Sequence, residues 1–222
     1  MEQSVLRIKR KDIYPEKSQL LYRLTPNTET LRADFEIAGG EWSFDGENLI
    51  SFTDRENGGL IYSKKHYCGD VLLDFYGKTI ESYDNDLNFT FCSNGWDYEK
   101  DCPKAGYLGG LQGWWIGKTG IEKTPYECNL EALTSMHRFT SGKEYHIQAG
   151  KVGNKVFVFV DGVMAVELSD PNPIERYGRV GLGSYASKIA FRDFKVLRPH
   201  VEPFVTTYAK MRNETDGEGN DE

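Results

Sequence analysis

The sequence predicts an all-β protein, a jelly-roll sandwich of two antiparallel sheets. Short runs alternate apolar with polar residues, turn pairs such as Asp-Gly end these runs, and helical periodicity is almost absent. The clearest run is Val156–Val160, where valines alternate with phenylalanines so that both faces are apolar. Such a strand has to be covered on both sides, which places it inside a layered structure. Asp161 and Gly162 then tolerate the positive φ of a tight turn, and Val163–Leu168 returns as the second arm of a hairpin.

The other expected elements are short strands bounded by turn residues. In chain order the strands are Trp42–Asp45, Asn48–Thr53, Leu60–Ser63, Val71–Lys78, Leu87–Cys92, Glu144–Ala149, Val156–Val160, Val163–Leu168, Gly178–Gly183 and Ile189–Leu197. Between them, Ser93–Lys143 is expected to be a long, aromatic-rich loop region, which in a compact domain is usually functional. Within it, Asn129–Met136 is expected to form a short helix.

A single domain is expected over residues 1–212, because neither an internal repeat nor a linker interrupts the strands. Residues 1–33 form an N-terminal arm and the first strands in this interpretation. Residues 213–222 hold five acids and no base, and are expected to be a disordered tail.

Charge and composition exclude several classes of partner. The formal net charge is −7, but most of it lies in the acidic tail, so the body is nearly neutral and no nucleic-acid partner is expected. No apolar run approaches the roughly 18 residues of a membrane span. No secretory signal is evident either, so we expect a cytoplasmic protein with no membrane partner. The cysteines form no CxxC pair and are expected to be buried free thiols: Cys68, Cys92, Cys102 and Cys128.

Segments in the last quarter of the chain resemble a known superfamily. They are Tyr145–Ile147, Lys155–Val166, Tyr177–Leu182 and Phe191–Val196. Their order is a strand, a valine-phenylalanine hairpin with Asp-Gly, a Gly-x-x-Gly strand and a Phe-x-Asp-Phe strand. This order resembles the closing strands of the concanavalin A-like lectin/glucanase superfamily, to which galectin-like and family 16 glycosidase domains belong. The resemblance implies a galectin-like sandwich with a concave sheet that binds sugar.

The whole chain also resembles a narrower group, the YesU-type bacterial proteins of unknown function. The resemblance lies in length and in the runs Asp86–Phe91 and Gly113–Trp115. Genes of that group occur among those for using rhamnogalacturonan, a pectin polysaccharide, which implies a role on pectin-derived oligosaccharides. Family 16 glycosidases carry Glu-x-Asp-x-x-Glu on one strand. No such segment exists here, so the resemblance supplies no catalytic pair.

Sugar-binding candidates come from the polar positions of alternating strands and from the aromatic-rich stretch. Asp, Asn, Gln and Arg suit sugar hydroxyls, and aromatic rings suit the C–H faces. The substrate-binding candidates are Asp74, Tyr76, Asn88, Trp96, Trp114, Trp115, Arg138 and Gln148. Adjacent tryptophans on a strand point to opposite faces, so only one of Trp114 and Trp115 is expected to meet a ligand. The alternative is an ordinary solvated sheet face.

Candidates for acid–base chemistry are His146, Glu81 and Asp86. Glu81 and Asp86 belong to an acidic loop before a strand, where burial would raise the pKa of a general acid; solvated loop acids are the alternative. His146 alternates with Gln148 and would suit the base of a lyase. Asp193 stands where some superfamily members bind a structural calcium ion, so it is the candidate metal ligand; no other cofactor is expected.

Two functions stay open on the sequence. One is a glycosidase or lyase acting on rhamnogalacturonan-derived oligosaccharides through a groove on the concave sheet. The alternative, which the missing catalytic motif keeps open, is a non-catalytic, lectin-like carbohydrate-binding module. An exposed sheet can also pair two subunits, so a homodimer is a further option.

Overall fold

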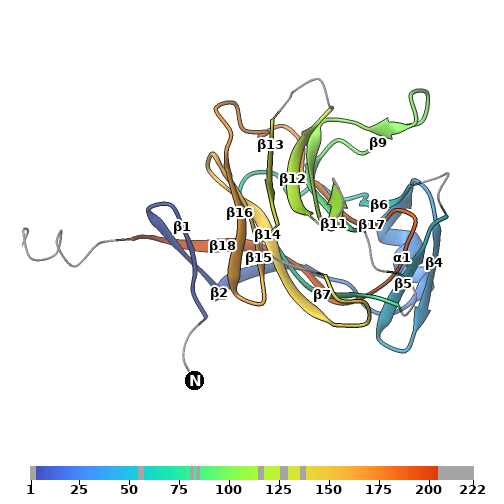
Figure 1. Cartoon of the computed structure of the whole chain (residues 1–222). Helices are drawn as coiled ribbons and strands as arrows, with labels where there is room; N and C mark the ends of the chain where they lie inside the picture. The colour runs from blue at the N-terminus through green and yellow to red at the C-terminus, as the bar shows by residue number, and fades with distance from the viewer. Residues whose placement is uncertain are drawn as a thin grey trace, which may run out of the picture.

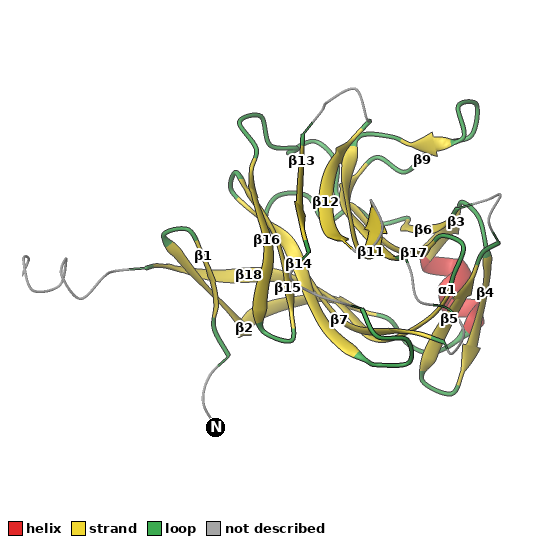
Figure 2. Cartoon of the chain, in the orientation of Figure 1, coloured by secondary structure: helices red, strands yellow, loops and turns green. Residues whose placement is uncertain are grey.

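The computed structural model describes residues 4–54, 58–80, 83, 86–114, 118–125, 130–135 and 139–204. Strands dominate, and the short helix α1 (Thr28–Asp34) lies beside them (Figure 2). The side chain of Asn27 caps α1 by accepting from the backbone N–H groups of Glu29 and Thr30. Within the described part of the chain, no helix is long and apolar enough to cross a membrane.

Two antiparallel sheets pack face to face, which confirms the predicted sandwich (Figure 1). Sheet A runs in the order β1 (Leu6–Ile8), β2 (Lys11–Arg23), β18 (Lys188–Pro203), β7 (Val71–Thr79), β14 (Tyr145–Val152), β15 (Lys155–Val160) and β16 (Val163–Ser169), with β5 (Asn48–Phe52) on β18 and β4 (Glu41–Asp45) on β5. Sheet B runs in the order β13 (Glu131–Thr134), β12 (Lys118–Thr124), β11 (Gly106–Trp114), β8 (Leu87–Ser93), β17 (Arg179–Ser184), β6 (Gly59–Ser63) and β3 (Phe35–Ile37). A separate hairpin pairs β9 (Trp96–Asp97) with β10 (Cys102–Pro103). Strands distant in sequence, such as β7 and β18, are neighbours, as in jelly-roll sandwiches.

The main core lies between the two sheets. Leu73 and Phe75 of β7 and Phe89 and Phe91 of β8 are fully buried in it. The rings of Phe75 and Phe89 meet edge to face with their centroids 5.8 Å apart. Because side chains alternate along a strand, the residues between these hydrophobics point away from the core on both sheets.

A second core covers the outer face of sheet A, where β1 and β2 fold over it. Phe157 and Phe159 of β15 pack there with Leu6, Ile8 and Ile13. The three valines of β15 instead face the main core. The prediction that this strand is covered on both faces is therefore confirmed.

The predicted hairpin after β15 is also confirmed. β15 and β16 pair antiparallel, and the two residues that join them, Asp161 and Gly162, have φ values of 50° and 77°. Two successive positive φ values are typical of a type I′ turn, whose twist suits a hairpin. The carboxylate of Asp161 also accepts from the backbone N–H of His146 at 2.9 Å, which ties the turn to β14.

Two predicted segments are wrong. Ser93–Lys143 is not mainly loop, because it contains β9 to β13, and β11 and β12 belong to sheet B. Glycines hide the alternation: a Cβ on Gly109 would lie 2.4 Å from the Phe89 ring, so the strand needs glycine at this inward position. Asn129–Met136 contains a strand instead of the predicted helix, because Glu131–Thr134 pairs with β12. Pairing with a sheet edge outweighs local helix propensity there.

Shortening one side chain on the outer face of β15 tests whether the strand is buried on both faces. We expect Phe157→Ala to lower the free energy of unfolding by about 3–5 kcal/mol, because it leaves a cavity in the second core. Val163→Ala, at a residue of the neighbouring strand that is 50% exposed, should change it by about 0.5 kcal/mol or less. Urea denaturation of both variants measures the difference, and equal effects would contradict the second core.

Candidate functional site

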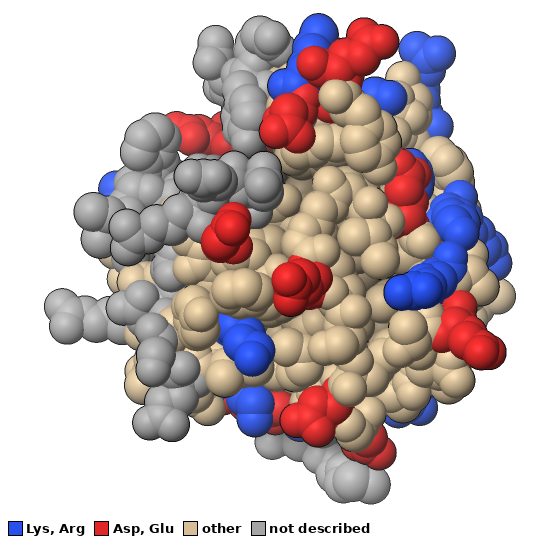
Figure 3. All heavy atoms as spheres, turned by 90° about the vertical axis from the view of Figure 1, so that its right-hand side faces the viewer, with Lys and Arg blue, Asp and Glu red and all other residues tan. Residues whose placement is uncertain are grey.

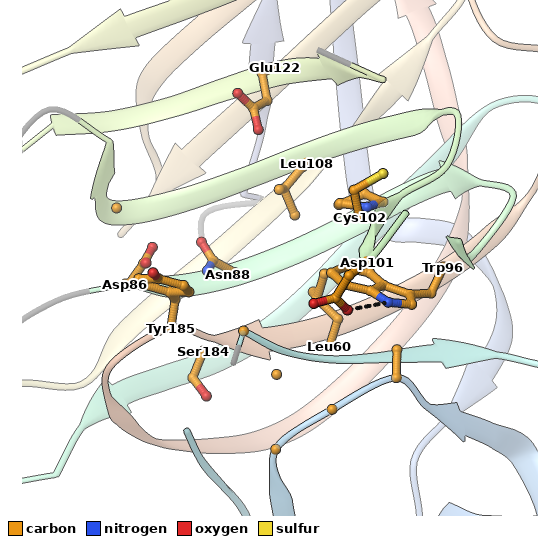
Figure 4. A pocket seen from close by; sticks show the side chains of 17 residues that line it. Leu60, Asp86, Asn88, Trp96, Asp101, Cys102, Leu108, Glu122, Ser184 and Tyr185 are labelled. Atoms are coloured by element: carbon orange, nitrogen blue, oxygen red, sulfur yellow. Dashed lines mark hydrogen bonds between the residues drawn. The ribbon is translucent and has the colours of Figure 1, made fainter. Parts of the chain in front are cut away.

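A pocket of about 500 Å³ opens on the outer face of sheet B, which points away from the main core. Four side chains of β6, β8, β11 and β12 line it: Leu60, Asn88, Leu108 and Glu122. The β9–β10 hairpin contributes a second part of the lining, and the segments 38–40 and 58–59 with Tyr185 contribute a third (Figure 4). Its volume is in the range of roughly 300–1,000 Å³ that is usual for ligand sites.

Strand register places the polar groups of this pocket. Leu108 of β11 lies opposite Thr90 of β8 and opposite Glu122 of β12, so all three side chains share the outer face of sheet B. Asn88 is two residues before Thr90 and points the same way. The pocket therefore combines an apolar surface with a carboxyl and an amide.

Asp86 lies at the end of the pocket where β8 begins, and the residue is only 9% exposed. Burial raises the pKa of Asp86 to about 7, although a hydrogen bond with Asn88 favours the charged form. A Cβ on Gly113 would lie 2.2 Å from Oδ1 of Asp86, so only glycine lets the carboxyl sit against this backbone. Oδ1 of Asn88 is buried without a hydrogen-bond partner among the described residues, which leaves an acceptor for a ligand.

The β9–β10 hairpin is held firmly over sheet B. Nε1 of Trp96 donates to Oδ1 of Asp101 at 3.3 Å, and the half-buried Trp96 ring packs on the apolar patch of the sheet. The hydroxyl of Tyr98 donates to Glu36 at 2.7 Å, and Arg179 donates to the other oxygen of Glu36 at 2.5 Å. These two bonds hold the pKa of Glu36 below its usual value. Glu36 therefore ties the hairpin to β3 and β17.

The charged groups in the described lining are all acidic: Asp86, Asp101 and Glu122. Figure 4 shows Asp86 and Asp101 at opposite ends of the pocket, with Glu122 at a third position. Figure 3 shows the side of the molecule that carries β9. Many of its Lys and Arg side chains lie toward the rim, and its middle is mostly uncharged, with a few isolated acidic and basic side chains.

The structure divides the sequence-predicted site residues between two opposite faces. Asp86, Asn88 and Trp96 line the pocket. Four others lie on the outer face of sheet A: Asp74, Tyr76, His146 and Gln148. The polar strand positions grouped as candidates from the sequence therefore do not share one face. Alternation predicts that a residue points away from the core, but it does not predict which of the two sheets its strand joins. Outside the described residues are Glu81, Trp115, Arg138 and the side chain of Trp114.

The four residues on sheet A belong to a polar network. Asp74 accepts from Nε2 of Gln148 at 2.7 Å and lies 3.2 Å from Nε2 of His146. Burial acts to raise the pKa of Asp74, but these contacts outweigh it and hold the pKa below its usual value. Tyr76 stacks on His146, with ring centroids 4.6 Å apart, and the guanidinium of Arg192 lies 4.0 Å from the Tyr76 centroid. Because its members partner one another, this network fits a stabilising role.

Asp193, the predicted calcium ligand, is surrounded by cations. Its carboxylate lies 2.6 Å from Arg23 and 2.7 Å from Lys195. Among the residues that the structure describes, no group of three or more His, Cys, Asp or Glu could hold a metal ion. The predicted calcium site at Asp193 therefore finds no support here.

The cysteines differ from the expected buried thiols. Cys92 is buried, and burial raises the pKa of its thiol to about 12. Cys68 is exposed, which makes that prediction wrong, and Cys102 is partly buried in the pocket wall. All three are free, and Cys128 lies outside the described residues.

Sequence reasoning missed Asp101, Glu122 and Tyr185, which also line the pocket. Glu122 follows the buried Ile121, and this alternation could have indicated an outward carboxylate on a strand. Asp101 and Tyr185 lie in turns that come near sheet B only through tertiary folding, and we find no local signal for them.

A sandwich of this topology, with a pocket on the outer face of one sheet, belongs to the galectin-like fold class. No protein-family model and no curated protein matches the chain. Solved structures do. The carbohydrate-binding module CBM66 from Bacillus subtilis matches with a TM-score of 0.58 at 15% identity, over 74% of this chain and 95% of that one. A Bacillus subtilis protein of unknown function with a galectin-like fold matches with a TM-score of 0.53 at 15% identity, over 82% and 96%.

The third similar structure is the Crh5 transglycosylase in complex with NAG. It matches with a TM-score of 0.56 at 9% identity, over 82% of this chain and 86% of that one. At these identities the likeness shows the fold alone. The chain thus has the galectin-like sandwich that the concanavalin A-like resemblance implies.

The buried carboxyl of Asp86 predicts a dependence of stability on pH. Its folded-state pKa of about 7 exceeds the ordinary 3.8, so the folded state holds a proton that the unfolded state releases. The protonated carboxyl contributes its full stability below about pH 4. As the pH rises from about 4 to about 7, the free energy of unfolding falls by up to about 4 kcal/mol. Asp86→Asn should remove this loss, so that the variant exceeds the wild type in stability at pH 8.

Urea denaturation between pH 5 and pH 8 measures this difference. Asp45→Asn, at an exposed carboxyl outside the pocket, is the matched control and should keep the pH profile of the wild type. A wild-type profile in Asp86→Asn would show that Asp86 does not hold the proton.

Proposed function

We propose that this protein binds an oligosaccharide in the sheet-B pocket. The observation that carries the proposal is that one pocket holds the half-buried indole of Trp96 toward one end and the buried polar groups of Asp86 and Asn88 toward the other (Figure 4). Sugars have both C–H faces, which pack on aromatic rings, and hydroxyls, which hydrogen-bond to carboxyl and amide oxygens. Small-molecule sites combine apolar surface with a few placed polar groups, and this pocket has both.

The similar structures support a carbohydrate-related function without identifying the sugar. One is a carbohydrate-binding module and another is a transglycosylase bound to NAG. A pectic ligand from rhamnogalacturonan is the finer part of the proposal, and it rests on the YesU-type resemblance of the sequence.

Glycoside hydrolysis is a second candidate function, which Asp86 favours. A pKa of about 7 leaves this carboxyl partly protonated at neutral pH, as a general acid requires. Glycosidases need a second carboxylate near the scissile bond, and Asp101 and Glu122 line the same pocket. Binding without turnover remains our first proposal, because the acid–nucleophile motif of family 16 glycosidases is missing.

Removing the indole of Trp96 tests the location of the site. We expect Trp96→Ala to weaken oligosaccharide binding by about 1–3 kcal/mol, the value of aromatic stacking on a flat ring. That corresponds to roughly 5- to 150-fold in Kd, measured by calorimetric titration. The matched control is Tyr76→Ala, which removes an aromatic ring from the opposite face of the molecule and should leave Kd unchanged. If Tyr76→Ala weakens binding and Trp96→Ala does not, the binding site lies on sheet A.

Turnover distinguishes the two candidate functions. We expect incubation with pectic oligosaccharides to show binding without new products. New reducing ends would instead establish a hydrolase, and Asp86→Asn should then lower kcat by roughly 10²–10⁴-fold if Asp86 is the general acid. An unsaturated product that absorbs ultraviolet light would indicate a lyase. A hydrolase whose kcat is unaffected by Asp86→Asn would exclude Asp86 as its acid.

A further inference from the structure

The charges around the sheet-B pocket restrict the kind of sugar that it can take. Its three acids come from three separate elements: Asp86 before β8, Asp101 between β9 and β10, and Glu122 on β12. Figure 4 shows them spaced around the pocket instead of clustered on one side. The described lining contains no Lys, Arg or His. A ligand that fills the pocket therefore meets carboxyl groups from several directions and no described cation.

Two cations near the lining residues, Lys123 and Arg179, are already engaged in ion pairs. Lys123 follows Glu122 but turns away, with Nζ 2.8 Å from Asp170 and donating to the carbonyl of Asn172. Arg179 is close to the β9–β10 hairpin, but its guanidinium is held by Glu36 and by the carbonyl of Ser63. Neither side chain can turn to an anionic ligand without breaking an ion pair.

The polar atoms of the pocket are mainly acceptors. Asp101 and Glu122 offer carboxyl oxygens as acceptors, and the buried Oδ1 of Asn88 is an acceptor without a partner in the described structure. A sugar hydroxyl donates to such oxygens and completes their hydrogen bonding. A carboxylate brings more acceptors and a negative charge, and burying it without a cation is strongly unfavourable.

We propose, on the basis of the proposed function, that the sheet-B pocket selects uncharged, hydroxyl-rich sugar units and rejects uronic acids. Selection of this kind comes from repulsion of the wrong ligand as much as from attraction of the right one. In a pectic fragment, the pocket would then hold neutral sugars, while galacturonate units stay in solvent. This differs from the usual solution for uronates, which is an arginine or lysine in the site.

Chemically matched ligands test the selection. An oligogalacturonate and its methyl ester share one backbone and differ in whether the carboxyl is charged. Neutral galacto-oligosaccharides of similar length and a neutral glycan array complete the panel. At about pH 7.5 and physiological salt, we expect the ester or a neutral glycan to bind at least tenfold more tightly than the free acid in calorimetric titration.

Two variants identify the source of the selection. Asp101→Asn and Glu122→Gln each replace a pocket carboxyl with an uncharged amide. Each should narrow the difference in affinity between the ester and the free acid by improving binding of the acid. Asp45→Asn removes a charge of the same kind outside the pocket and should leave the difference unchanged. Melting temperatures of all three variants show whether the fold is intact.

The outcomes separate the inference from the function on which it rests. Free acid that binds as tightly as its ester would overturn the selection and leave the binding function standing. An affinity difference between ester and free acid that stays unchanged in both Asp101→Asn and Glu122→Gln would also overturn the selection. The carboxyls of the pocket would then not be its cause. If no ligand of any class binds the wild type, the proposed function fails, and the selection fails with it.

Discussion

The packing of β7 on β8 is the constraint on which the rest of the molecule depends. Phe75 and Phe89 meet across the main core, and the neighbouring hydrophobics of both strands lie inward with them. Since the side-chain period of a strand is two, fixing Phe89 inward forces Asn88 outward into the pocket. A slip of one residue would bury the amide in the core and expose the phenylalanines. The position of the candidate site is therefore a consequence of hydrophobic register.

The outer faces of the two sheets are covered in different ways. On sheet A, β1 and β2 fold over Phe157 and Phe159, and beyond them the polar network around Asp74 satisfies its own hydrogen bonds. On sheet B, the β9–β10 hairpin stands over the strands and leaves a pocket beside Trp96. In that pocket, Oδ1 of Asn88 is a buried acceptor without a hydrogen-bond partner among the described residues.

The sequence predicts those features of the fold and the site that local interactions determine, and it misses those that depend on contacts between distant segments. The two-sided strand β15 and its Asp161–Gly162 turn follow from local pattern, and the sequence predicts both correctly. The strands β11 and β12 were missed because glycines such as Gly109 replace the alternating side chains where neighbouring rings need the space. Asn88 was proposed as a site residue from its strand and Asp86 from the loop before that strand, and the structure places both in the pocket. His146 and Gln148 were grouped with them in error, because strand pairing over long distances decides which sheet a residue joins.

The anchoring of the β9–β10 hairpin by Glu36 affects how a ligand would enter. Tyr98 and Arg179 hold the two oxygens of one carboxylate, so this wall of the pocket is in place before any ligand arrives. The conformational entropy of ordering the hairpin is then lost during folding instead of during association. A rigid wall of this kind favours rapid, reversible exchange of ligands that already fit, and it leaves little freedom to reshape the pocket around a different one.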